Sequence, residues 1–207
     1  MRNELMQVLS ALGTFFIYAV LAVFAQNAIF TRALGVSRLV KLVDDEGVDS
    51  VTFGILLCVI ELIASPMAYF ANSIWLSKVD YRGYIRPLIY VLCMGVAFLI
   101  VLFFVAVVFK GKGRDSLAIL PMATFNCCVL GVLLITTTQS FTLLQTMGFA
   151  LGSGVGYIIA VLVVTEGQRK IQNENVPAAF KGLPVTLLYI SVLALAIYGF
   201  TGHMQSF

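Results

Sequence analysis

Two adjacent thiols and an amide lie deep inside an apolar run. Asn126, Cys127 and Cys128 belong to FNCCVLG, within Ser116–Thr165, where there is no Asp, Glu, Lys or Arg. Thiolates bind soft metal centres, and iron–sulfur clusters are usually held by four of them. A free cysteine in an apolar stretch is also a common small packing residue. Cys127 is therefore a candidate metal ligand, and Cys128 is a weaker one.

A single acid lies in another apolar run. Glu61 is the only charged residue of Ser50–Ser77. Ionisable residues inside a membrane are costly, and by default they indicate function. Glu61 is thus a candidate for an ion path, with a structural hydrogen bond between helices as the alternative.

Other residues with chemical potential are better explained by packing. Cys58 and Cys93 lie in apolar stretches where no disulfide framework is indicated. Gly148, Gly152 and Gly156 recur every four residues in an apolar run, a spacing that favours close contact between membrane helices. The lone histidine, His203, has no neighbours with which to form a metal site.

The composition indicates the elements that must position these residues. The 207-residue chain is 60% apolar and 11% charged, and its mean hydropathy is +1.00. A soluble domain is about one quarter charged. The sequence therefore predicts an all-α integral membrane protein that forms a single domain over residues 1–207. The basic residues occur in short clusters without interleaved aromatic residues, which argues against a nucleic-acid partner.

Six spanning helices are expected, because each uncharged run is long enough to cross a bilayer. The run Ser116–Thr165 is too long for one span, and the polar string TTTQS at Thr136–Ser140 is the natural turn inside it. Pro121 should bend the first of these two helices, and Asn126 could cap the break. The expected helices are Leu5–Thr31, Ser50–Ser77, Pro87–Phe109, two within Ser116–Thr165, and Gly182–Gly202.

The distribution of basic residues predicts the orientation. Nine Lys and Arg residues follow the odd-numbered helices, and four lie on the opposite side. The first group is Arg32, Arg38, Lys41, Lys110, Lys112, Arg114, Arg169, Lys170 and Lys181; the second is Arg2, Lys78, Arg82 and Arg86. Basic loops remain in the cytoplasm. Both termini are therefore expected on the outer side of a bacterial inner membrane.

A faint internal repeat divides the chain into halves of about 1–110 and 111–207. At an offset of 96 residues, TRALGV at Thr31–Val36 falls on CCVLGV at Cys127–Val132. Three helices in each half would give two inverted repeats, whose broken segments meet near the bilayer midplane. In this register Thr31 is the counterpart of Cys127.

Three segments resemble the Rnf/Nqr family of membrane electron-transport subunits. FNCCVLG resembles the family segment TNCAVLG, with Asn126, Cys127 and Gly131 at matching positions. VPAAFKG at Val176–Gly182 resembles VPAPFRG. LGVSR, which contains Gly35, resembles the end of LCPFMGVSK.

The resemblance implies a function. It implies a subunit of the RnfA/NqrE type, within a complex that passes electrons from reduced ferredoxin towards NAD and moves Na⁺ or H⁺. The partner would be a homologous RnfE/NqrD-type subunit of opposite orientation. The two would hold one [2Fe–2S] cluster with two cysteines from each chain.

One departure leaves alternatives open. Thr31 stands where the family has its first-motif cysteine, which leaves either a cluster with a different fourth ligand or no cluster. The chain also lacks a nucleotide motif, a flavin-attachment motif and an acid–base constellation, so we do not expect it to be an enzyme alone. The alternative function is a cluster-less inverted-repeat transporter or a scaffold membrane protein without a redox role.

Overall fold

The fold is built from helices. The structure is a computed structural model, and it describes residues 2–44, 50–109, 114–171, 176–177 and 180–202. Over these residues the elements follow in this order: α1 (Arg2–Val23), α2 (Ala28–Arg32), α3 (Val36–Asp44), α4 (Ser50–Ile74), the short 3₁₀ helix η1 (Leu76–Lys78), α5 (Arg82–Phe109), α6 (Arg114–Thr124), α7 (Cys127–Thr138), α8 (Leu143–Ile171) and α9 (Leu183–Thr201).

The lengths and hydropathies of these helices fit a multi-pass membrane protein. Within the described residues, α1, α4, α5, α8 and α9 are long and apolar enough to cross a bilayer. The pair α6–α7 is also long and apolar enough if the two helices form one span, which bends by 41° at the break. The prediction of an all-α integral membrane protein is confirmed.

Most of the predicted helices occur where the uncharged runs placed them. Helix α4 and η1 cover Ser50–Ser77, and α9 corresponds to Gly182–Gly202. The turn at TTTQS is confirmed, because α7 ends at Thr138 and Ser140 has a left-handed φ of 54°. Helix α5 begins at Arg82, ahead of the predicted Pro87, because a charged residue at the membrane edge ends the apolar run without ending the helix.

The prediction for the first helix was wrong in its extent. The expected span Leu5–Thr31 stops at Val23 and resumes as α2. The side chain of Asn27 causes the interruption by accepting hydrogen bonds from the backbone amides of Ile29 and Phe30. An Asn side chain that caps a new helix competes with continuation of the old one.

Helix α3 is a short amphipathic helix that lies in the predicted loop after the first span. Its buried residues are Leu39, Val40 and Leu42, and Lys41 remains exposed. Apolar residues on one face with basic residues on the other are typical of a helix at a membrane surface. The charges that marked this segment as a loop therefore belong to the polar face of a helix. Of the other predicted loop residues, Lys110 and Lys112 lie outside the described residues, as does His203.

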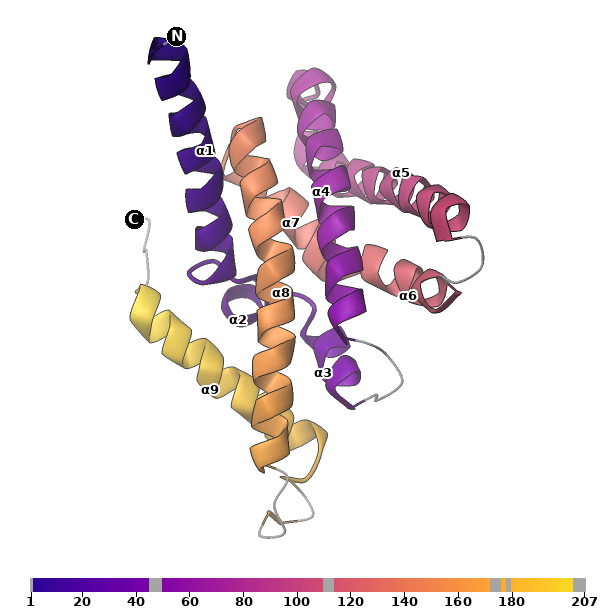
Figure 1. The fold of residues 1–207 in the computed structure, drawn as a ribbon, viewed down its shortest axis with the longest axis vertical. Coiled ribbons are helices and arrows are strands. Elements are labelled where there is room, and N and C mark those ends of the chain that lie inside the picture. The colour runs from indigo at the N-terminus through magenta and orange to yellow at the C-terminus, as the bar shows by residue number, and fades with distance from the viewer. Residues whose placement is uncertain (1, 45–49, 110–113, 172–175, 178–179, 203–207) are drawn as a thin grey trace.

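Helix α8 forms the centre of the molecule, with α1 packed on one side and α4 on the other (Figure 1). Glycines allow the close approach. A Cβ at Gly148 would overlap the Phe15 carbonyl, and one at Gly152 would overlap the Ala19 carbonyl. Gly156 lies against Asn27 and the end of α1. The packing role predicted for these three glycines is confirmed.

The same order of elements occurs twice along the chain. A broken helix pair comes first in each half, α1–α2 and then α6–α7, and it is followed by a long central helix, α4 or α8, and an outer helix, α5 or α9. The two central helices pack against each other, with Gly54 against Ile158 and Gly154 against Cys58. The residue numbers of these contacts increase along α4 as they decrease along α8, so the two helices are antiparallel.

Candidate functional site

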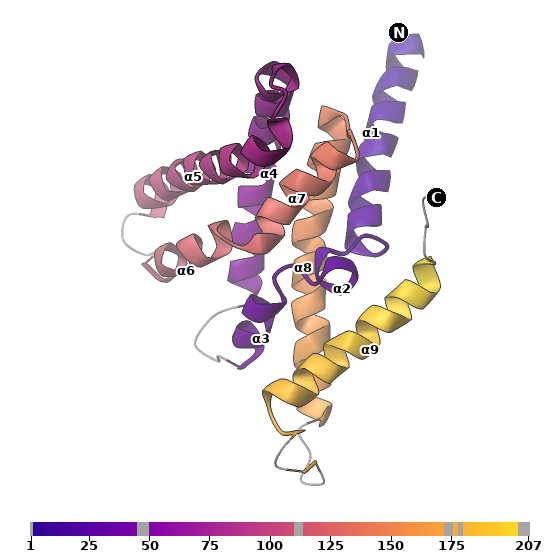
Figure 2. The ribbon, with the colours of Figure 1, turned by 180° about the vertical axis from the view of Figure 1, so that it is seen from behind.

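Both broken pairs resume at an asparagine. Asn27 caps α2, and the Asn126 side chain caps α7 by accepting a hydrogen bond from the amide of Cys128 at 2.9 Å. Asn is among the best N-cap residues because its carbonyl oxygen satisfies amides that have no partner in the helix. The capping role predicted for Asn126 is confirmed. Figure 2 shows α6 and α7 crossing α4 and α8, with α2 on the same side.

The two breaks contact each other through the loop that follows α2. The backbone amide of Gly35 donates a hydrogen bond to Cys127 Sγ at 3.0 Å. Leu34 packs directly on Gly131, where a Cβ would overlap its side chain. The hydroxyl of Tyr157 on α8 donates a weak hydrogen bond to the carbonyl of Gly35 at 3.4 Å. Gly35 and Gly131 therefore hold the two halves together at the site of the cysteines.

The two adjacent cysteines face different surroundings. Cys127 is exposed on the surface of the chain, whereas Cys128 is fully buried. The thiol of Cys128 lies 3.8 Å from the hydroxyl of Ser153 on α8. Of these two thiols, only that of Cys127 is available to a group held outside this chain.

The positions opposite Cys127 carry no thiol. Counted from the capping asparagines, the counterpart of Cys127 is Ala28, three residues before the Thr31 indicated by the sequence offset. Ala28 is a buried methyl group. Thr31 is exposed, and its hydroxyl donates a hydrogen bond to the carbonyl of Asn27 at 2.7 Å. Neither residue provides a thiolate.

The remaining two cysteines belong to packed helices. Cys58 on α4 contacts α8 at Gly154, and Cys93 is buried on α5. Among the described residues, no group of three or more His, Cys, Asp or Glu side chains is placed to hold a metal ion. The chain therefore offers Cys127 as its one surface thiol near the breaks.

Glu61 lies near the middle of α4 and is 0% exposed. The hydroxyl of Ser153 donates a hydrogen bond to Glu61 Oε1 at 3.4 Å. Glu61 Oε2 has no hydrogen-bond partner in the described part of the chain, and neither has the hydroxyl of Ser65 one turn further along α4. Sequence reasoning identified Glu61 but missed Ser65 and Ser153. The four-residue spacing from Glu61 to Ser65 was the available signal.

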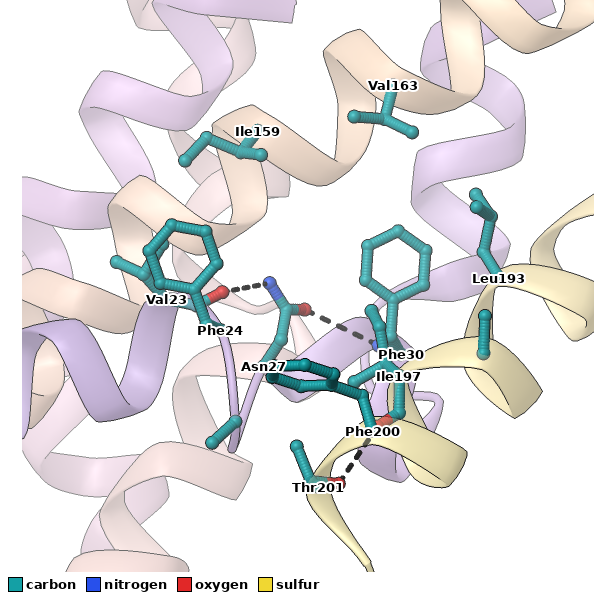
Figure 3. Close-up of a pocket in the computed structure, with 12 residues that line it drawn as sticks. Val23, Phe24, Asn27, Phe30, Ile159, Val163, Leu193, Ile197, Phe200 and Thr201 are labelled. Carbon is teal, nitrogen blue, oxygen red and sulfur yellow. Dashed lines mark hydrogen bonds between the residues drawn. The ribbon is translucent and has the colours of Figure 1, made fainter.

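A separate groove of about 440 Å³ lies between the end of α1, α8 and α9 (Figure 3). Its lining is almost entirely apolar, with Phe24, Phe30, Ile159 and Leu193 among the side chains. The amide of Asn27 is already bonded to the carbonyls of Val23 and Gly156. The groove therefore presents no free polar group of Asn27 to a ligand and is distinct from the site of Cys127.

Comparison with known proteins agrees with this arrangement. The family model described as "Rnf-Nqr subunit, membrane protein" matches residues 15–204. One relative is the A-type subunit of the Na⁺-translocating ferredoxin:NAD⁺ oxidoreductase complex of Acetobacterium woodii. The chain is 27% identical to it over 186 residues, which cover 87% of this chain and 93% of that relative.

Two further relatives carry a similar name, as A-type subunits of ion-translocating oxidoreductase complexes. The one from Vibrio cholerae serotype O1 strain El Tor Inaba N16961 is 30% identical over 146 residues, covering 69% of this chain and 74% of that relative. The one from Syntrophotalea carbinolica is 37% identical over 83 residues, covering 40% and 43%. The family model spans nearly all of the chain, and the motifs around Gly35 and Cys127 lie within it. The chain belongs to the Rnf-Nqr family of membrane subunits.

Proposed function

We propose that this chain is the A-type membrane subunit of an ion-translocating oxidoreductase complex. In that complex it helps to carry electrons across the bilayer between reduced ferredoxin and NAD, coupled to the movement of Na⁺ or H⁺. The names of its relatives support this assignment. The observation that carries it is the meeting of the two helix breaks at the hydrogen bond between Gly35 and the exposed Cys127.

The partner is a homologous membrane subunit of the RnfE/NqrD type, seated on the face that carries Cys127. Thr31, Arg32, Phe125 and Cys127, which flank the two breaks in the sequence, are all exposed. Phe125 is 56% exposed. A cation such as Arg32 in contact with lipid is costly within the membrane, and a second protein chain would remove that cost. The distribution of basic residues supports an orientation with both termini outside the cell.

A [2Fe–2S] cluster shared by two such chains would need two cysteines from each. The residues present do not fit that ligand set, because this chain has only Cys127 at the surface beside the breaks and its counterparts are Ala28 and Thr31. The Gly35 amide would stabilise a thiolate at Cys127, since hydrogen bonds to sulfur tune such ligands.

The missing thiol favours a second candidate. In it the chain keeps the fold and the partner of the family but acts without a redox group, either as a scaffold or as an ion-carrying subunit. The observation behind this candidate is that neither counterpart of Cys127, Ala28 or Thr31, carries a thiol. The two candidates differ in whether iron is bound at the paired subunits.

The experiment is a measurement of iron and acid-labile sulfide in the complex purified with its sister subunit. Cys127→Ala is compared with Cys128→Ala, which changes the neighbouring buried thiol. About two irons for each pair of subunits, lost only in Cys127→Ala, would support the electron-carrying role. An intact complex without iron at this pair would contradict that role and leave the second candidate.

A further inference from the structure

Two buried side-chain oxygens that lack hydrogen-bond partners in the described part of the chain lie one turn apart on α4. Glu61 Oε2 and Ser65 Oγ are both fully buried on α4 and have no hydrogen-bond partner within the described residues. Ser153 Oγ lies 3.4 Å from the other carboxyl oxygen. Buried polar groups are normally satisfied, so exceptions indicate either strain or an absent ion or ligand. Glu61 and Ser153 are thus in contact, and Ser65 lies one turn from Glu61 along α4.

A polar cavity of about 140 Å³ lies further along the same helices, towards the η1 end of α4 and the turn between α7 and α8. Its polar lining residues are Tyr69, Asn72, Thr136, Thr137, Ser140 and Thr146. Ser140 is exposed, whereas Thr136 and Thr146 are buried. The cavity therefore leads from the surface into the interior between α4, α7 and α8.

The cavity and the buried oxygens share the same helix faces. On α4, Ser65 and Tyr69 follow Glu61 at four-residue intervals, and residues four apart lie on one face. On α8, Thr146 lies seven residues, or about two turns, before Ser153. Ser65 is one turn, about 6 Å, from the level of Tyr69. The small residues Ala64 and Ala68 occupy the buried surface of α4 between the two places.

We propose that Glu61, Ser65 and Ser153 form a binding site for Na⁺, reached through the cavity between α4, α7 and α8. The site lies near the middle of the membrane and opens towards the side on which both termini lie. This inference rests on the proposed function, because it assigns to this chain a part of the ion route of the complex.

The chemistry of the site favours a hard monovalent cation. Carboxylate and hydroxyl oxygens are the ligands that hard cations prefer, whereas the soft thiol of Cys128 beside them is not. One carboxylate supplies one negative charge, which one Na⁺ neutralises. Burying an unpaired carboxylate is very unfavourable, and a bound cation removes that penalty. The hydroxyl of Ser65 would gain the partner that it lacks.

The first test measures the binding of radioactive Na⁺ to the purified complex. Glu61→Gln should remove one bound Na⁺ from each complex, and Ser65→Ala should weaken that binding roughly tenfold. Glu166→Gln and Ser191→Ala are the controls, since both residues are exposed and should leave binding unchanged. Equal Na⁺ binding by wild type and Glu61→Gln would overturn the proposal. If Glu61→Gln does not assemble with its partners, Ser65→Ala decides, and an unchanged affinity overturns the proposal.

The second test probes the route. Thr146→Cys in membrane vesicles should react with a membrane-impermeant thiol reagent added on the side of the termini, and Na⁺ should slow that reaction. Ser77→Cys, exposed in η1 at the same end of α4 but outside the cavity lining, is the control whose reaction Na⁺ should not change. Reaction only from the opposite side would overturn the proposed entrance.

Electron transfer from reduced ferredoxin to NAD is measured on the same complexes. If the wild-type complex lacks this electron transfer, the proposed function is wrong. If the wild-type complex shows it but Glu61→Gln leaves Na⁺ binding unchanged, only the proposed Na⁺ site is wrong.

Discussion

The amide of Gly35 donates a hydrogen bond to the thiol sulfur of Cys127 across a sequence separation of 92 residues. This bond joins the two halves of the chain at their breaks, with Gly35 at a φ of 79° that few other residues adopt. A Cβ on Gly35 would lie only 2.9 Å from the ring of Tyr157. Conformation and space both require glycine at this position.

Replacing Gly35 with alanine should therefore destabilise the protein by about 2–4 kcal/mol, from left-handed strain together with the contact on Tyr157. The free energy of unfolding is measured by titration with SDS in mixed micelles. Gly182→Ala is the matched control, because Gly182 has the same φ but open space around it. It should lose only the backbone strain, about 1–3 kcal/mol, because its φ of 79° with a ψ of −127° is a conformation that few residues other than glycine adopt. Equal losses in the two variants would show that Tyr157 does not restrict the position.

The contact between α1 and α8 predicts a second pair of variants. Gly152→Ala should destabilise the chain by about 1–3 kcal/mol, because its Cβ would overlap the backbone of Ala19 and push the helices apart. Gly199→Ala on α9 meets no atom within 4 Å and should be neutral or slightly stabilising, since alanine favours helix. The same unfolding titration compares them. A harmless Gly152→Ala would mean that α1 and α8 are not in tight contact.

The two capping asparagines should differ in their contributions. Asn126→Ala removes one capping bond and should cost about 1 kcal/mol. Asn27→Ala removes a cap and also the hydrogen bonds that its amide donates to the carbonyls of Val23 and Gly156, so the loss should reach about 2–4 kcal/mol. Unfolding free energies of both variants provide the measurement. A larger loss for Asn126→Ala would contradict this order.

The different exposure of the adjacent cysteines predicts different alkylation. In the isolated subunit in detergent, N-ethylmaleimide should modify Cys127 readily and Cys128 only after unfolding. In the assembled complex Cys127 should be protected as well, because the partner covers its face. Mass spectrometry of peptides locates the label, and Cys127→Ala identifies the fast site. Rapid labelling of Cys127 in the intact complex would contradict the proposed partner face.

The sequence was most informative where an element depends on local composition. Uncharged runs located α4, α8 and α9, since a bilayer requires apolar residues along the whole span. The break at Asn126 was predictable because Pro121 precedes it. The break at Asn27 was not, since an asparagine in an apolar run does not reveal whether its oxygen will cap a helix or face a neighbouring one.

The candidate site was less predictable because it depends on distant contacts. Glu61 was identifiable as a charge in an apolar run, but its contact with Ser153 crosses 92 residues. Serines in membrane helices often bond to their own backbone, so the four-residue spacing from Glu61 could point to Ser65 but could not show that its hydroxyl lacks that bond. The sequence offset pairs Cys127 with Thr31, whereas counting from the two caps pairs it with Ala28, and the cap at Asn27 was not visible in the sequence.

The parallel contact of α1 with α8 has a consequence for biosynthesis. The amide of Asn27 reaches the carbonyl of Gly156, which is 129 residues further along the chain. At about 5–20 residues per second, a ribosome needs on the order of ten seconds to make that stretch. During this interval the first helix is already in the lipid without the glycine surface against which it packs. During synthesis, α1 must therefore remain in the bilayer without its packing partner until α8 leaves the translocon.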